Sequence, residues 1–248
     1  MKVSKFIAKY SLDDVLKIEQ NDSQNLAIKH AWETIRDQYG DSMSARNSFL
    51  YLLIQTALVS YQVAGSWPLW WDEITQKIAA DFGDVWPLLR EGQCPGERWY
   101  KTLTNSHYNK RLYNNKRNRL VRFYKYFGEY FNVETIDYEY FYNDMKSLLQ
   151  YIMSTTKATS ISKTAVFAIK IFGYGARRVY DDLKIFPMDI SIPLDSRLRK
   201  IWKLELGEVR DTDLLNWFNE LWKKHGIPPL HLDSLLRIEY WNIYVLNW

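Results

Sequence analysis

The sequence predicts an all-α protein, and three observations support this fold class. Apolar residues recur at intervals of three and four along most of the 248-residue chain, which is the period of an amphipathic helix. Strict alternation of apolar and polar residues, the mark of a half-buried strand, is rare. No period of about 20 to 50 residues repeats, and no Gly/Ser or Pro linker occurs, so a repeat array is not expected. We expect about ten helices and little or no sheet.

The helical elements can be followed in order along the chain. The clearest periodic segments are LDDVLKIEQ (12–20), FLYLLIQTALVSYQV (49–63), LRKIWKLEL (198–206), LLNWFNELWKK (214–224) and LDSLLRIEYWNIYVL (232–246). Turn-forming residues interrupt the pattern at 21–23, 65–68, 92–96, 187–193 and 226–229. Such clusters of Asn, Asp, Ser, Gly and Pro end one helix and begin the next. Each of the last two breaks delivers an aspartate, Asp195 and Asp233, to the start of a helix.

Composition indicates one compact, ordered protein. Apolar residues make up 47% of the chain and charged residues 25%, which is ordinary for a globular protein and unlike a disordered one. Residues 1–248 are therefore expected to form a single compact unit. The one cysteine, Cys94, excludes an internal disulfide and a four-cysteine iron–sulfur loop. His107, His225 and His231 are scattered along the sequence, so we expect neither a metal nor a cofactor.

No segment of the sequence predicts a signal peptide or a membrane span. The N-terminus lacks a sustained apolar core. The most apolar stretch, 48–65, is broken by Gln55, Ser60 and Gln62, so it is predicted to be a buried helix. We expect a monomer in the cytoplasm, associated with the chromosome.

The net charge of +4 conceals a strongly basic segment between residues 98 and 128. It contains nine basic and no acidic residues: Arg98, Lys101, Lys110, Arg111, Lys116, Arg117, Arg119, Arg122 and Lys125. The rest of the chain holds 24 basic against 29 acidic residues, a balance of −5. A local patch of one sign is typical of a surface that binds a polyanion. We expect Arg111, Lys116 and Arg119 to contact a DNA backbone; the alternative is a solvated helix face.

The candidate catalytic pair is Lys163, at the head of a predicted helix, and Asp195, 32 residues later. An uncharged, desolvated amine can attack a sugar carbon, and a nearby carboxylate can stabilise the positive charge that develops on the sugar. This pairing suggests covalent catalysis on a nucleoside. Asp195 has a second interpretation, since an aspartate that follows Pro193-Leu194 and precedes SRLRKIW is a good N-cap.

One face of the helix predicted from about residue 162 combines amines with aromatic rings. Lys163, Phe167, Lys170 and Tyr174 are spaced i, i+4, i+7 and i+11, so they share that face. A helix that packs only in the core has no reason to align lysines beside aromatics. A surface helix whose lysines extend along apolar neighbours remains the alternative.

Four separated segments resemble one known family. They are VLKIEQNDSQNLAIKHA (15–31), LVSYQVAGSWPLWW (58–71), KTAVFAIKI (163–171) together with FPMDISIPLDSRL (186–198), and GIPPLHLDSLL (226–236). Together they resemble the archaeal GO glycosylases, which are 8-oxoguanine DNA glycosylases of the helix-hairpin-helix superfamily. The resemblance implies an all-α fold of two interdependent helical lobes with the active-site cleft between them. The helix-hairpin-helix region would lie at about 141–175, with a hairpin, KATSIS (157–162), that lacks a Gly-x-Gly turn.

The resemblance also implies a bifunctional glycosylase and lyase that acts on 8-oxoguanine in DNA. Lys163 would be the Schiff-base nucleophile and Asp195 the assisting carboxylate. Trp71 and Phe167 would sandwich the flipped base, since a purine offers two flat faces. The polar groups of the base pocket would be Gln24, Lys170 and Asp233. Without the resemblance, the sequence favours a core or helix-capping aromatic for Trp71, a loop polar group for Gln24 and an N-cap for Asp233.

Two other functions stay open at this point. Where the family usually has a tryptophan one turn after its C-terminal aspartate, this chain has Arg237. A glycosylase of the same superfamily that removes another damaged purine is therefore an alternative. The other alternative is a non-catalytic helical module that binds nucleic acid through the basic segment.

Overall fold

The structure, a computed structural model, describes residues 2–63, 67–104, 106–125, 132–156, 162–207 and 210–241. Every regular element within these ranges is helical, which confirms the all-α prediction. The described ranges hold more helices than the ten or so expected, because several are very short. The six-residue helices α1 (Lys2–Ile7) and α8 (Tyr138–Asn143) have too few residues to produce a periodic signal.

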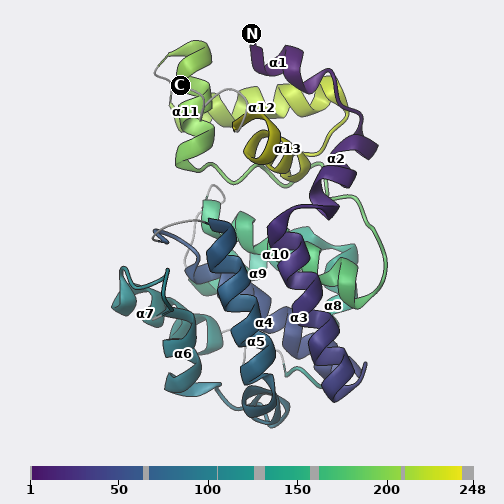
Figure 1. Ribbon diagram of the computed structural model, residues 1–248. Helices are drawn as coiled ribbons and strands as arrows, with labels where there is room; N and C mark the ends of the chain where they lie inside the picture. The colour runs from purple at the N-terminus through teal and green to yellow at the C-terminus, as the bar shows by residue number, and fades with distance from the viewer. Residues whose placement is uncertain are drawn as a thin grey trace. The chain divides into compact units, whose positions relative to one another are not determined.

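The chain divides into two compact units (Figure 1). Unit 1 comprises Met1–Asp22 and Ile185–Trp248, and unit 2 comprises Ser23–Lys184. Besides α1, the helices of unit 1 are α2 (Leu12–Gln20), α11 (Ser196–Leu206), α12 (Asp211–His225), α13 (Pro229–Leu235) and the π-helical segment η2 (Leu236–Tyr240). Besides α8, those of unit 2 are α3 (Ser23–Tyr39), α4 (Met43–Val59), α5 (Trp67–Arg90), α6 (Gly96–Thr104), α7 (Tyr113–Phe123), α9 (Met145–Thr156) and α10 (Lys163–Val179). The interdependence of two lobes stays a prediction.

Unit 2 is built around α4, which is buried on all sides from Phe49 to Val59. This confirms the predicted buried helix for residues 48–59 of the most apolar stretch; residues 60–63 follow the end of α4, and 64–65 lie outside the described residues. Helices α5, α7 and α10 pack on α4, and α3 packs against both α5 and α10. The approach of α10 is close at Gly175, where an added Cβ would lie 2.4 Å from a methyl carbon of Leu53. No helix among the described residues is long and apolar enough to cross a membrane.

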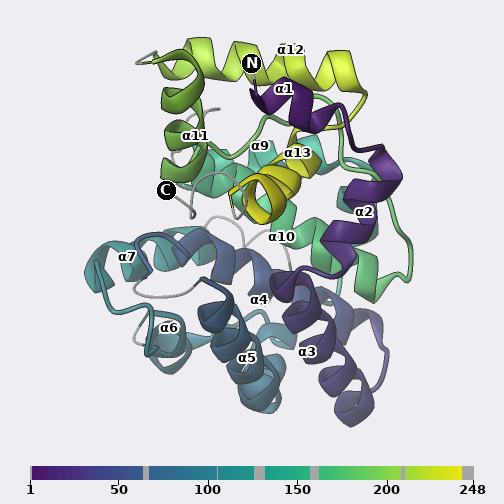
Figure 2. The same ribbon diagram turned by 45° about the horizontal axis from the view of Figure 1, so that its top comes forward.

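Unit 1 has its own apolar core, formed by residues from both ends of the chain. Phe6 of α1 contacts Tyr240 of η2 with the ring centroids 5.1 Å apart, and α2 packs on α13. Figure 2 shows α12 beside α1 in this unit, and Ser4 Oγ lies 3.4 Å from His225 Nε2. The first 22 residues therefore belong structurally with the C-terminal quarter of the chain.

Local signals set most of the helix ends near the predicted breaks. Ser11 and Asp14 form a reciprocal capping box at the start of α2. Gly226 ends α12 in the left-handed region at φ 66°, a conformation that glycine adopts without steric cost. Pro229 then occupies the first turn of α13, where its missing N–H is not needed. The expected hairpin lies between α9 and α10, and its turn, 157–161, is outside the described residues.

Candidate active site and DNA-binding surface

The face of α10 predicted to carry chemistry runs from solvent into the interior of unit 2. Lys163 is the first residue of the helix and is exposed. Phe167, one turn later, is half-buried, and Lys170 and Tyr174 are fully buried. The Lys170 ammonium lies 5.7 Å from the centre of the Tyr174 ring, a cation–π distance. From the exposed end of this face inward, the Lys163 amine is thus followed by the Phe167 ring and the Lys170 amine.

Trp71 of α5 and Phe167 of α10 are brought together, but not as parallel plates. Their ring centroids are 6.2 Å apart and the ring planes meet at 63°. Stacking a base between two rings needs parallel planes about 7 Å apart, since each contact takes about 3.5 Å. One ring therefore has to turn for the predicted sandwich to form. Trp71 is fully buried, and its indole N–H has no hydrogen-bond acceptor among the described residues.

Gln24 lies in the first turn of α3 and is 1% exposed, so the alternative of a polar loop residue is wrong. Helix α3 packs on α5 and α10, and Asn25 next to Gln24 accepts a hydrogen bond of 3.3 Å from Arg178 of α10. Unit 2 therefore places Gln24, Trp71 and Phe167 on three helices that pack against one another.

In unit 1, Asp195 is the N-cap of α11, as its sequence context suggested. Its Oδ1 accepts hydrogen bonds from the backbone N–H groups of Arg197, at 2.9 Å, and Leu198, at 3.0 Å. Its Oδ2 accepts from the Arg197 guanidinium, 2.7 Å from Nε and 2.6 Å from Nη2. The carboxylate is thus fixed by helix amides and paired with a cation. Sequence reasoning missed Arg197, although an arginine two residues after an N-cap aspartate can reach back to it.

Asp233 is not an N-cap, because α13 begins four residues earlier at Pro229. It is buried, 5% exposed, and lies within the helix. Lys163 and Gln24 belong to unit 2, whereas Asp195 and Asp233 belong to unit 1. The pairing of Lys163 with Asp195 stays a prediction.

His231 and Ser234, on either side of Asp233 in the sequence, belong to a buried polar network. The sequence did not predict this network. Glu19 of α2, itself 0% exposed, accepts hydrogen bonds from His231 Nδ1, at 2.9 Å, and from Ser234 Oγ, at 2.7 Å. The Phe186 backbone N–H donates to His231 Nε2 at 3.0 Å. His231 accepts at Nε2 and therefore carries its proton at Nδ1, so the ring is neutral. The sequence signal was a glutamate on the apolar face of α2, one turn after the buried Val15.

Arg237, the departure from the family pattern, forms an ion pair with Asp22 in unit 1. Both side chains are nearly buried, 10% and 5% exposed. Asp22 is the last residue of unit 1 before the chain enters α3. Where a tryptophan is usual in the family, this chain therefore has a buried charge pair that holds the α2–α3 connection to η2.

The three residues expected on the DNA backbone differ sharply in exposure. Arg111 is exposed. Lys116 is fully buried, donates to Asn109 Oδ1, and lies 5.0 Å from the centre of the Tyr61 ring. Burial, with a smaller contribution from neighbouring Arg119, lowers the pKa of Lys116 to about 8. Its ammonium faces the interior, so the expectation that it lies on a phosphate-binding surface does not fit this geometry.

Arg119 is partly buried and has a role at the end of α4. It donates to the Leu58 carbonyl at 3.1 Å and stacks over Tyr61, with its guanidinium carbon 4.6 Å from the ring centre. Burial lowers the pKa of Arg119. Cations stabilise the carbonyl groups at a helix C-terminus, so Lys116 and Arg119 together support the end of α4. The exposed cations of the basic segment are Lys101, Lys110, Arg111, Arg122 and Lys125, together with Arg98, which pairs with Asp84.

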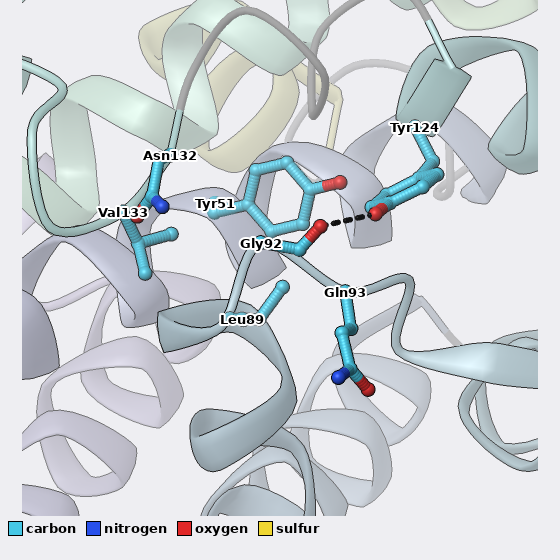
Figure 3. A pocket seen from close by; sticks show the side chains of 7 residues that line it. All are labelled: Tyr51, Leu89, Gly92, Gln93, Tyr124, Asn132 and Val133. Carbon is cyan, nitrogen blue, oxygen red and sulfur yellow. Dashed lines mark hydrogen bonds between the residues drawn. The ribbon is translucent and has the colours of Figure 1, made fainter.

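A small cavity in unit 2 contains none of the predicted site residues (Figure 3). The Tyr124 hydroxyl donates to the Gly92 carbonyl at 2.7 Å beside it. Tyr51 also lines the cavity, and burial raises the pKa of its hydroxyl well above the usual value. A phenol whose pKa is raised stays protonated and cannot serve as a base. Among the described residues, no group of three His, Cys, Asp or Glu side chains could hold a metal ion.

Comparisons with known proteins agree on one family. The model of the AGOG family, described as N-glycosylase/DNA lyase, matches residues 4–244. An N-glycosylase/DNA lyase of Methanococcus maripaludis is 34% identical over 79% of this chain and 72% of its own length. The protein of the same name from Nanoarchaeum equitans is 30% identical over 97% and 88%. The fold matches Pa-AGOG, an 8-oxoguanine DNA glycosylase from Pyrobaculum aerophilum solved with 8-oxoguanosine, with a TM-score of 0.70, 22% identity, and coverage of 99% of this chain and 90% of that one.

Proposed function

Because the chain belongs to the AGOG family of N-glycosylase/DNA lyases, we propose that it removes 8-oxoguanine from DNA and cleaves the strand through Lys163. The substrate proposal draws on the resemblance of the site segments and on the structural relative, which is an 8-oxoguanine DNA glycosylase. Because the relatives are named as enzymes, the alternative of a non-catalytic module that binds nucleic acid has no support. We further propose that the protein acts as a monomer at the chromosome, in the cytoplasm.

The observation that carries the proposal is the depth gradient along α10. A nucleophile for a sugar carbon has to meet the DNA backbone, and Lys163 is exposed at the helix head. The base, once flipped, has to enter a dry pocket. The side chains that follow on the same face, half-buried Phe167 and buried Lys170, offer a ring and a hydrogen-bond donor at increasing depth.

The proposed reaction begins with extrusion of the nucleotide. The neutral Lys163 amine attacks C1′, the bond from C1′ to the base nitrogen breaks, and its electron pair leaves with the base, which takes up a proton. The attached amine then loses one proton, the bond from C1′ to the ring oxygen O4′ breaks, O4′ takes up a proton, and C1′ and the Lys163 nitrogen form a protonated Schiff base. Removal of a proton from C2′ then expels the 3′ phosphate by β-elimination. No step needs an oxidant, a metal or a cofactor.

The proposed contribution of Asp195 is a fixed negative charge for the sugar as it becomes cationic. Its cap bonds to Arg197 and Leu198 hold the carboxylate before substrate arrives, so little reorganisation is needed during the reaction. The Arg197 guanidinium donates to Oδ2, so its positive charge partly neutralises the carboxylate until the cationic sugar forms nearby.

Borohydride trapping on a duplex with one 8-oxoguanine tests the proposal. Wild-type protein is expected to form a covalent adduct and a cleaved strand. Lys163→Gln is expected to abolish both while duplex affinity stays nearly unchanged, because the nucleophile is lost and the binding surface is kept. Lys170→Gln is the matched control and should still trap a preformed abasic site. An adduct that persists in Lys163→Gln would assign the nucleophile to another amine.

The proposed base pocket has its own diagnostic contrast. Trp71→Ala and Phe167→Ala are each expected to weaken 8-oxoguanine excision by about 1–3 kcal/mol, the usual effect of losing one base–aromatic stack. Cleavage of a preformed abasic site should fall far less, since that substrate has no base to hold. A parallel loss of both activities with a lowered melting temperature would make the two rings core residues only.

The buried pair of Arg237 and Asp22 favours one further candidate substrate class. A charged group in place of an aromatic ring changes the hydrogen-bonding partners near Asp233, and a purine with a different oxidised or alkylated edge could fit better. A panel of lesion duplexes in single-turnover assays ranks the candidates. If the protein excises another damaged purine faster than 8-oxoguanine, that purine becomes the proposed substrate.

A further inference from the structure

Helix α13 carries the proposed pocket carboxylate, Asp233, but its length gives it little control over where that carboxylate points. All seven of its residues are buried, and a helix of this length takes its position from its neighbours. Apolar contacts are non-directional, so they do not by themselves fix the rotation of so short a helix about its axis. The direction of Asp233 therefore depends on directional bonds to the rest of unit 1.

Glu19 of α2 supplies such bonds at two points of α13. Its Oε2 accepts from His231 Nδ1 at 2.9 Å, and its Oε1 accepts from Ser234 Oγ at 2.7 Å. All three side chains are 0% exposed. Because His231 and Ser234 are three residues apart, they lie on one face of the helix. A carboxylate that meets each of them with a separate oxygen fixes the rotation of that face as well as its position along α2.

The imidazole of His231 is itself held in the orientation that this contact needs. The Phe186 backbone N–H donates to His231 Nε2 at 3.0 Å, so Nε2 carries no proton and the proton lies on Nδ1, toward Glu19. The Phe186 ring also contacts the imidazole, with ring centroids 4.8 Å apart. The backbone of residue 186 therefore sets the tautomer through which Glu19 holds α13.

Asp233 lies on another face of the same helix. At about 100° per residue, Asp233 is about 100° around the helix from Ser234 and about 160° from His231. A rotation of α13 about its axis would swing the Asp233 carboxylate through the same angle. Bonds that fix the face of His231 and Ser234 therefore also fix the direction of Asp233.

Stability alone does not account for a buried carboxylate at residue 19. Burying a carboxylate carries a desolvation cost, and apolar side chains of similar volume often replace a buried polar cluster without loss of stability. A fully bonded buried network instead specifies one arrangement of the elements that it joins. Glu19, His231 and Ser234 have the geometry of such a network.

From these observations we infer that Glu19 is a positioning residue for base excision, which acts through His231 and Ser234 to hold Asp233 in the direction that the base pocket requires. The inference rests on the proposed function, in which Asp233 is a polar group that meets the flipped base. Glu19 contacts neither the base nor the sugar in this scheme. Its effect should therefore appear in excision of the base and not in cleavage of a site that has already lost its base.

Glu19→Met tests this role, because it removes both acceptors and keeps a similar side-chain volume. Single-turnover excision of 8-oxoguanine is expected to fall roughly 10- to 100-fold, the effect of a small misplacement in an active site. Cleavage of a preformed abasic site should change little. Glu19→Gln is the conservative variant and should restore excision, since its amide oxygen can accept from His231 and its NH₂ can donate to the Ser234 hydroxyl. If Glu19→Met does not fold, Ser234→Ala removes one attachment and should show a smaller loss of the same kind.

Two further variants separate positioning from a general loss of stability. Leu214→Ala removes buried methyl groups from α12 of the same unit, so it should lower the melting temperature. At a temperature at which every variant is folded, its excision rate should equal that of the wild type. In an Asp233→Asn background, Glu19→Met should cause little further loss, because the group that it positions is already impaired.

The inference is overturned if Glu19→Met excises at the wild-type rate, if its loss is the same in both backgrounds, or if Glu19→Gln is equally impaired. If the wild type releases no 8-oxoguanine, the proposed function fails instead. The hold of Glu19 on α13 is then measured by amide hydrogen exchange across residues 229–235, which should quicken in Glu19→Met and not in Glu19→Gln. Unchanged exchange in Glu19→Met would overturn the inference in that case too.

Discussion

At the scale of single residues, Asp195 is the N-cap of α11, and the proposed catalytic role is compatible with that position. Its Oδ1 caps α11 while its Oδ2 pairs with Arg197. A cap requires only a hydrogen-bond acceptor, whereas stabilising a cationic sugar requires a charge. The two roles can therefore be separated by a substitution that keeps the acceptor and removes the charge.

Asp195→Asn is expected to keep α11 capped and to lower single-turnover strand cleavage by orders of magnitude, with DNA affinity intact. Asp195→Ala also removes the cap and should cost about 1 kcal/mol of unfolding free energy in addition. Rapid-quench assays and urea unfolding measure the two effects. Near-normal cleavage by the Asn variant would restrict Asp195 to its structural role.

Lys116 gives a prediction for stability against pH. Its folded-state pKa is lowered from 10.5 to about 8, so between these values the unfolded chain binds more protons than the folded one. The penalty for burying the charge is fully present below pH 8 and is relieved as the pH rises toward 10.5. Unfolding free energy should accordingly rise with pH across this window more steeply in wild type than in Lys116→Met. Parallel pH profiles from urea unfolding would contradict this assignment.

At the scale of elements, the position of α10 depends on how closely it approaches α4. A Cβ at Gly175 would meet Leu53 at 2.4 Å and Leu50 at 3.0 Å, both nearer than normal packing allows. Helix α10 carries Lys163, Phe167 and Lys170. Its packing against α4 thus depends on the absence of a side chain at Gly175, twelve residues after the start of the helix. The close contact at Gly175 sets how near α10 lies to α4.

Gly175→Ala is expected to lower unfolding free energy by about 1–3 kcal/mol, the usual cost of overpacking a core. In a Leu53→Ala background the same change should cost clearly less, because the Leu53 methyl carbon that would lie 2.4 Å from the new Cβ is gone. Thermal or urea unfolding of the four proteins completes the cycle. An equal cost in both backgrounds would mean that the Leu53 side chain moves aside in Gly175→Ala and does not cause the loss of stability.

Helix α13 shows how a short element acquires a defined place. It has seven residues, too few to be stable alone. Glu19 of α2 fixes it through His231 and Ser234, and the same histidine accepts from the Phe186 N–H. His231 and Ser234 flank Asp233 in sequence, so the proposed pocket carboxylate lies between two residues that hydrogen-bond to Glu19 of α2.

At the scale of the whole molecule, the basic segment divides into two groups. Lys116 and Arg119 are used inside unit 2, at the end of α4. Lys110, Arg111 and Arg122 are exposed, and we expect these three to bind DNA phosphates. Binding to phosphates releases counterions, and this term is independent of base sequence.

Neutralising Lys110, Arg111 and Arg122 together is expected to weaken binding to lesion-bearing and undamaged duplexes about equally. The slope of log affinity against log salt should decrease by up to about 0.9 for each lost phosphate contact. A control that neutralises Lys5, Lys223 and Lys224, exposed lysines of unit 1, changes the net charge equally and should leave more of the slope. Equal salt slopes for the two triple variants would indicate that the basic segment is a solvated surface that does not bind phosphates.

The sequence by itself determined the fold class, the family, most helix boundaries and the helical face of Lys163, Phe167 and Lys170. These features rest on short-range physics. A helix repeats every 3.6 residues, and caps such as Ser11 with Asp14 or Asp195 with Leu198 act within one turn. Such signals can be recognised from a few consecutive residues, whatever the rest of the chain does.

Only the tertiary structure decided which polar side chains are buried and with whom. Lys116 has the same local context as its exposed neighbours, yet it is enclosed by Asn109 and Tyr61. Glu19 and His231 are 212 residues apart, and Arg237 and Asp22 are 215 apart. A buried charge is tolerated only where a partner meets it, and such partners come together only when distant segments of the chain pack. For that reason the exposure of each basic residue and the surroundings of Asp233 could be learned only from the folded chain.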